Sequence, residues 1–150
     1  QSLDLRVQAL ESAIGGGGSA VVRSAKAPQN AMNSQLQDAI KKIQSNNIAP
    51  AITELQAIIA SGDKNSAASA RYFLSVAYVA NSQYKEAINE ANKFIATNSN
   101  NKYVPDAMRV VYISQTQLGN TTAANATAKK LIKSFPNSEA AKKVAKQLQQ

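Results

Sequence analysis

The chain has 150 residues, of which 44% are hydrophobic and only 5% aromatic, and it contains neither Cys nor His. This length predicts one domain with a sizeable core, and the missing residue types exclude disulfides, thiolate metal sites and the commonest general base. Abundant Ala, Gln, Asn and Lys favour an all-α fold, and a net charge of +8 favours anionic partners such as nucleic acid, acidic lipid, an acidic polymer or an acidic protein.

The first predicted element is a short amphipathic helix over residues 1–14. Its apolar residues follow spacings of four, three and four, which is the pattern of a coiled-coil seam. The seam residues are Leu3, Val7, Leu10 and Ile14. We predict an oligomerisation helix, and Val or Ile at a positions with Leu at d positions favours two strands. The alternative is a helix docked on its own domain, which Leu5, off the seam, favours.

A linker is predicted over residues 15–32, because four consecutive glycines and the later Pro28 make an ordered element costly in backbone entropy. The main domain is expected over residues 33–150. No apolar run approaches the roughly 20 residues that a membrane-spanning helix needs. Since the sequence starts with Gln1 instead of Met, we expect that any signal peptide has been removed.

Three copies of one helix pair are predicted within residues 33–150. A shift of 37 residues aligns small and apolar residues of the second copy with the third, and a shift of 36 aligns the second with the first. The aligned sets are Ala51, Ala87 and Ala124; Leu55, Ala91 and Ala128; and Ile58, Phe94 and Leu131. The predicted helices cover residues 33–45, 50–61, 66–81, 84–97, 104–118, 121–135 and 138–149.

Proline, glycine and asparagine separate these helices. Pro50 and Pro105 fit a first helical turn, whose N–H groups have no partner within the helix. Pro136 ends one helix, and Ser138 is the predicted N-cap of the last. The turns within the three pairs are predicted at residues 45–47, 81–83 and 119–120.

Alanine at recurring positions predicts close helix packing. Ala77, Ala87 and Ala91 would let neighbouring helices approach one another at their crossing points. Larger side chains are then expected to fill the space between layers, namely Tyr72, Phe73, Leu74 and Tyr78.

The repeated pair resembles the tetratricopeptide repeat in its small residues, its tyrosine and the Ala that begins the second helix. The phrase SARYFLSVAYVANSQYKEAI, residues 69–88, is similar to repeats of the periplasmic CpoB (YbgF) family associated with the Tol-Pal system, and FPNSEAAKKVAKQL, residues 135–148, resembles that family's ending. A coiled coil, a linker and three repeats are also that family's layout. Ser75 stands where the family usually has Gly, and Tyr112, its equivalent in the third copy, is expected to push the helices apart or turn outward.

The resemblance implies a tetratricopeptide-type α-α superhelix, a trimer, and a periplasmic, non-enzymatic role in cell division. The implied partners are TolA and a bifunctional peptidoglycan synthase. Stacked repeats form a groove lined by the first helix of each pair, suited to an extended segment or a partner helix. By repeat position we expect the groove residues to be Leu36, Ile40, Gln44, Tyr72, Val76, Arg109, Ile113 and Gln117. Ordinary core packing is the alternative for Tyr72 and Ile113, whereas burial of Arg109 is costly unless a carboxylate meets it.

Two other classes of function are alternatives to a scaffold. Six lysines and one acid, Glu139, lie between residues 129 and 146, which fits either a solvated helix face or a site for an anionic polymer. An enzyme is disfavoured: Glu86 and Glu90 fit surface ion pairs, and the glycine run lacks the Lys-Ser/Thr of a phosphate-binding loop. No cofactor or metal is expected.

Overall fold

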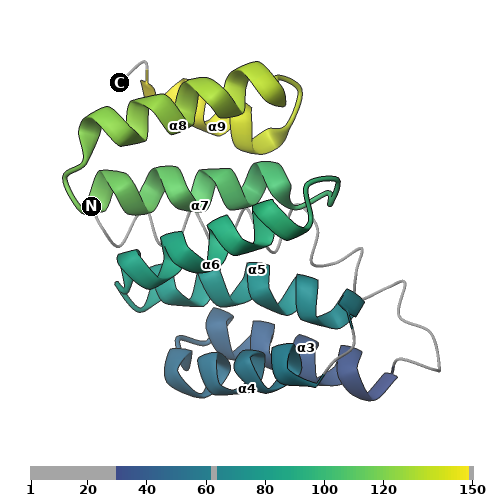
Figure 1. The fold of residues 1–150 in the computed structure, drawn as a ribbon. Helices are drawn as coiled ribbons and strands as arrows, with labels where there is room; N and C mark the ends of the chain where they lie inside the picture. The colour runs from purple at the N-terminus through teal and green to yellow at the C-terminus, as the bar shows by residue number, and fades with distance from the viewer. Residues whose placement is uncertain (1–29, 62–63, 149–150) are drawn as a thin grey trace.

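A computed structural model describes residues 30–61 and 64–148, which form helices joined by turns (Figure 1). The predicted helix over residues 1–14, with its seam, and nearly all of the predicted linker lie outside these ranges. The all-α expectation is confirmed for the described part. Its helices are α3 (Asn30–Gln44), α4 (Ile48–Ala60), α5 (Lys64–Ala80), α6 (Tyr84–Thr97), α7 (Val104–Gln117), α8 (Thr121–Ser134) and α9 (Glu139–Leu148).

The helices form three antiparallel pairs, α3–α4, α5–α6 and α7–α8, followed by α9. Each helix packs on its neighbours in the chain. The odd-numbered helices also contact one another in order, α3 with α5, α5 with α7 and α7 with α9. The pairs therefore stack along one direction, as Figure 1 shows from α3 and α4 at the bottom to α8 and α9 at the top.

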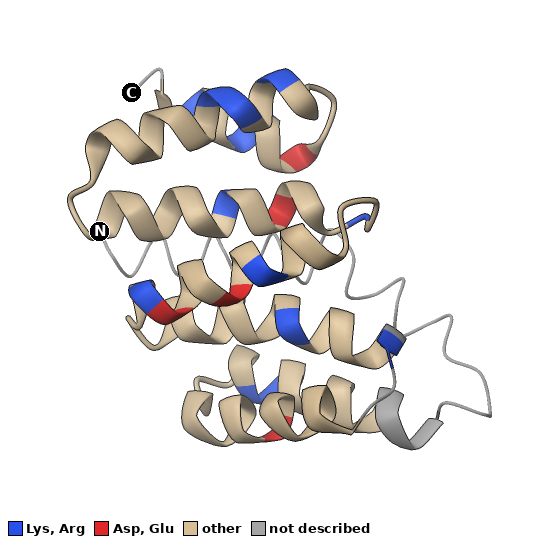
Figure 2. Cartoon of the chain, viewed as in Figure 1, with Lys and Arg blue, Asp and Glu red and all other residues tan. Residues whose placement is uncertain are grey.

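The charged residues are spread unevenly along this stack (Figure 2). The first two pairs carry both signs, and each contains an ion pair between its two helices: Lys42 with Glu54, and Arg71 with Glu90. On α8 and α9 the charge is mostly positive. The lysines there, all exposed except the half-buried Lys143, are Lys129, Lys130, Lys133, Lys142, Lys143 and Lys146.

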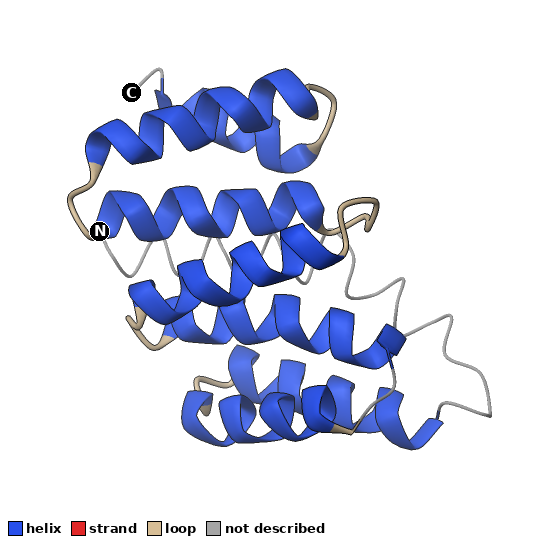
Figure 3. Cartoon of the chain, viewed as in Figure 1, coloured by secondary structure: helices blue, strands red, loops and turns tan. Residues whose placement is uncertain are grey.

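The two helices of each pair are joined by a short turn (Figure 3), and the three turns have the same backbone geometry. Asn46, Ser82 and Gly119 have φ values of +66°, +62° and +82°, in the left-handed region that ends many helices. The next residue in each turn donates its backbone N–H to a carbonyl five positions earlier. These hydrogen bonds are Asn47 to Lys42 at 2.7 Å, Gln83 to Tyr78 at 2.7 Å and Asn120 to Gln115 at 2.9 Å. The turns are thus repeated at intervals of 36 and 37 residues.

Fully buried alanines sit between the helices at the predicted spacing. Ala77, Ala87 and Ala91 have no exposed surface, and Ala51, Ala124 and Ala128 are buried at related positions in the other pairs. Small side chains at these points let the helix axes come close, while larger ones fill the space beside them. Tyr112 differs from the expectation of an outward turn, because its side chain is 8% exposed and packs in the core.

The cap predicted at Ser138 is present. Its hydroxyl oxygen accepts a hydrogen bond of 3.0 Å from the backbone N–H of Ala141, in the first turn of α9. Pro105 lies in the first turn of α7, and Pro50 in the first turn of α4, as expected. Within the described residues, no helix is both long and apolar enough to cross a membrane.

Candidate functional site

The side chains predicted to line a partner groove fall into two groups. Gln44 is exposed and Gln117 is half-buried. The other six are buried, with at most 6% of their surface exposed: Leu36, Ile40, Tyr72, Val76, Arg109 and Ile113. Tyr72 and Ile113 lie in the core. Ordinary core packing was the alternative given for these two residues. The role of the eight as a partner groove stays a prediction.

Aromatic rings join α5 to the start of α7. The ring of Tyr72 stacks on that of Tyr103, with 4.7 Å between centroids and 8° between planes. Phe73 meets both rings edge to face, and the ring centroid of Phe94 in α6 lies 5.9 Å from that of Tyr72. Such pairs add about 0.5–1.5 kcal/mol each beyond their buried area. The cluster therefore fixes how the second and third pairs meet.

A carboxyl group with an altered pKa lies next to this cluster. Burial raises the pKa of Asp106 from 3.8 to about 6, although Arg109 and Lys143 act in the opposite direction; Glu139 raises it further. The negative charge of Asp106, added to burial, holds the pKa of Tyr72 well above its usual range. Arg109 thus has a carboxyl group of its own helix close enough to interact, which is the kind of partner that its burial requires.

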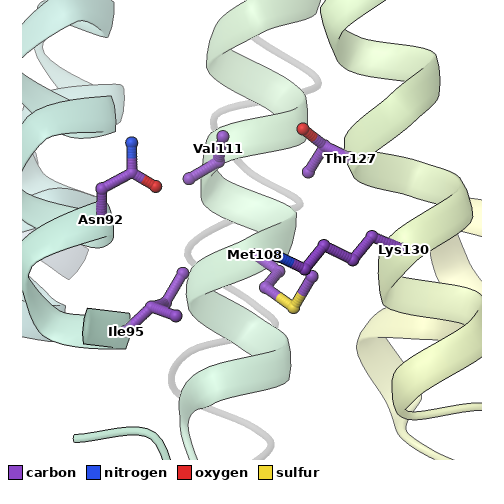
Figure 4. Close-up of a pocket in the computed structure, with 6 residues that line it drawn as sticks. All are labelled: Asn92, Ile95, Met108, Val111, Thr127 and Lys130. Atoms are coloured by element: carbon purple, nitrogen blue, oxygen red, sulfur yellow. The ribbon is translucent and has the colours of Figure 1, made fainter. Parts of the chain in front are cut away.

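A pocket opens on another face, between α6 and α8 (Figure 4). It has a volume of about 140 Å³ and is partly open to solvent. Two buried side chains of α7, Met108 and Val111, form its floor. Lys130 reaches across from α8 toward Met108 in Figure 4. The remaining lining residues are Ile95 and Asn92 of α6 and Thr127 of α8.

The sequence prediction missed this pocket, although the repeat alignment contained a signal for it. A shift of 37 residues places Met108 on Arg71 and Thr127 on Glu90, the two members of an ion pair 2.7 Å long in the second helix pair. Replacement of both charged residues at once, by an apolar residue and a hydroxyl, indicates that this space is filled differently in the third pair.

The described residues contain no cluster suited to holding a metal ion. No group of three or more Asp or Glu side chains within them is placed to hold an ion. Comparison with known protein families and with curated proteins gives no match to this chain.

Proposed function

We propose that this chain is a non-enzymatic, protein-binding scaffold built from tetratricopeptide-type helix pairs. The observation that carries the proposal is the equivalence of Asn46, Ser82 and Gly119, three left-handed turn residues spaced by 36 and 37 residues. Contact between successive odd-numbered helices adds to it, because repeats that stack in this way form a superhelix with an extended surface for partners.

The proposed setting is the bacterial periplasm, in cell division. It is supported by the similarity of residues 69–88 and 135–148 to the Tol-Pal-associated CpoB family. In this proposal the chain binds TolA and a bifunctional peptidoglycan synthase, and it coordinates constriction of the outer membrane with synthesis of the septal wall. A homotrimer formed by residues 1–14, which lie outside the described part, completes the proposal.

Calorimetric titration of the periplasmic region of TolA into the full chain tests this function. The same titration uses a version that starts at Asn33 and is repeated at two salt concentrations. We expect saturable binding by both versions, because the proposed partner site lies on the repeats. Absence of a complex with either version would contradict the proposed partner, and binding by the full chain alone would move the site to residues 1–32.

The lysines of α8 and α9 favour a second candidate, binding of an anionic polymer. Five of the six are exposed, and Glu139 is the single acid between residues 129 and 146. Such binding should weaken steeply with salt, because each neutralised phosphate releases counterions. Reversal of Lys129, Lys130 and Lys133 to Glu should abolish it, whereas the matched reversal of Lys41, Lys64 and Lys85 should have a much smaller effect.

A further inference from the structure

The second and third helix pairs differ at one group of equivalent positions, where the second pair has an ion pair between its two helices. In the second pair, Arg71 and Glu90 join α5 to α6, and Lys93 lies 3.9 Å from the same carboxylate. The first pair also has a glutamate at this position, Glu54, which pairs with Lys42. The third pair has Thr127 there, so it alone of the three lacks the carboxylate.

The lysine of this group is retained in the third pair. A shift of 37 residues places Lys130 on Lys93, and Lys130 forms no ion pair with any residue of the described ranges. The hydroxyl of Thr127 donates a hydrogen bond of 2.7 Å to the Gln115 side-chain oxygen. Thr127 therefore has its own partner, while the exposed cation of Lys130 stands at the pocket without an acidic one.

The floor of the pocket is apolar, and its two side chains are smaller than those at the equivalent positions of the second pair. Met108 replaces Arg71, and Val111 replaces Leu74, a loss of one methylene group. Both floor residues are nearly buried, at 6% and 5% exposed. A cavity of about 150 Å³ lined by apolar side chains accepts a molecule as large as benzene. The 140 Å³ observed here is therefore enough for one aliphatic side chain.

We propose that this pocket binds a protein segment that carries an aliphatic side chain next to an acidic residue. The aliphatic side chain would lie on Met108 and Val111, and the acidic residue would pair with Lys130 in the place that Glu90 occupies beside Lys93. This inference rests on the proposed role as a protein-binding scaffold and adds a partner class and a binding site to it.

The lining of the pocket favours this occupant over a polyanion or an aromatic ligand. Lys130 is its only charged lining residue, whereas a phosphate polymer needs several cations in a row. No aromatic ring lines it that would stack on a base or a sugar. An apolar floor with one cation at the edge matches a short peptide motif, in which burial provides affinity and the ion pair provides orientation.

Selection from a phage-displayed library of random 12-residue peptides tests the proposal. The full chain is the target, and a Met108→Arg/Thr127→Glu variant, which restores the side chains of the second pair, is the counter-target. We expect wild-type selection to enrich peptides with Leu, Ile or Val beside Asp or Glu. Absence of any sequence enriched over the counter-target would overturn the proposal.

Fluorescence anisotropy on the best selected peptide locates the contact. Lys130→Glu and Met108→Arg/Thr127→Glu should each weaken binding at least tenfold. Val111→Leu, which only fills space and matches Leu74, should weaken it severalfold and guards against misfolding of the double variant. Lys85→Glu changes the net charge equally on exposed α6 surface and should leave affinity within twofold.

Two outcomes of this measurement reject the pocket. One is equal affinity for the wild type and the double variant, and the other is equal weakening by Lys85→Glu and Lys130→Glu. Either would leave the scaffold role standing if TolA or the selected peptide still binds, because the two proposals are measured with different ligands.

Discussion

The second and third helix pairs have the same backbone arrangement but different side chains at several equivalent positions. Their turns have the same hydrogen bonds, and alanines occupy matching buried positions. Yet Arg109 stands where the second pair has Tyr72, and Met108 stands where it has Arg71. The second pair has an ion pair between its helices and a ring that stacks at the start of α7, whereas the third has a buried cation beside a carboxyl group and a pocket.

This difference separates residues that set the repeat from residues that are free to change. Helix spacing depends on small side chains at the crossings and on the left-handed turn residue. The positions between those points accept aromatic, charged or aliphatic side chains. Binding surfaces can therefore differ from one pair to the next while the stack is retained.

The largest expected effect comes from the rings of the second pair. Phe94 and its equivalent Leu131 are both fully buried. Phe94→Ala should lower the free energy of unfolding by about 3–5 kcal/mol, and by about 1 kcal/mol more than Leu131→Ala, because a ring contact with Tyr72 is also lost. Urea denaturation of the two variants measures this, and a larger loss in Leu131→Ala would contradict it.

The next effect concerns Asp106, which stands where the second pair has the uncharged Ser69. Its pKa is about 6 in the folded chain, against an ordinary 3.8. The folded chain therefore holds this proton more tightly than the unfolded chain does. The free energy of unfolding therefore falls as the pH rises from about 4 to about 6, and above that range the destabilisation by Asp106 is complete.

Asp106→Asn should accordingly raise the free energy of unfolding by about 2 kcal/mol at pH 7, with no gain below pH 4. Denaturation at several pH values measures this. The exposed Asp38 provides the control, since Asp38→Asn should change stability by less than about 0.5 kcal/mol. A loss of stability at pH 7 in Asp106→Asn would show that its attraction to Arg109 outweighs the burial.

Exchange of turn residues gives a smaller effect with opposite signs in the two pairs. Ser82 adopts a left-handed φ of +62°, which is unfavourable for a residue with a Cβ, whereas Gly119 adopts +82°. Ser82→Gly should raise the free energy of unfolding, measured by urea denaturation, by about 1 kcal/mol, and Gly119→Ser should lower it by a similar amount. A Cβ at Gly119 meets nothing within 4 Å, so steric contact would not explain a loss. Two changes of the same sign would contradict this account.

The smallest expected effect is loss of the ion pair of the second pair. The side chains of Arg71 and Glu90 keep 27% and 16% of their surface exposed, so solvent screens their attraction. Glu90→Gln should lower the free energy of unfolding by about 0.5–1 kcal/mol. The loss should shrink in 1 M salt, and an effect independent of salt would show that packing rather than charge is responsible.

Much of the fold could be predicted from the sequence, because the repeat is marked in two ways. The positions of the helices agree with the prediction to within three residues at each end, since Pro, Gly and Asn mark the turns and alanine marks the crossings. The first helix of the first pair differs from its equivalents in burial. Ser34 and Asp38 are exposed there, whereas their equivalents Ala70 and Leu74 are buried by the preceding pair.

The candidate site was much less predictable. Repeat position assigned Val76 to the predicted groove side of its helix, but its burial, at 1% exposed, depends on packing between helices that are distant in sequence. The pocket depends on two residues, Met108 and Thr127, that are unremarkable alone. Only comparison with the ion pair of Arg71 and Glu90 shows that they leave space between the helices.

The contacts between neighbouring helices also affect how the chain folds. Because each helix packs mainly on the next one or the next but one, most native contacts join residues close in sequence. Chains with such local contacts fold quickly, and formation can begin at any helix pair and spread to its neighbours. We expect it to begin most often at the second pair, because the ring cluster links that pair to the third.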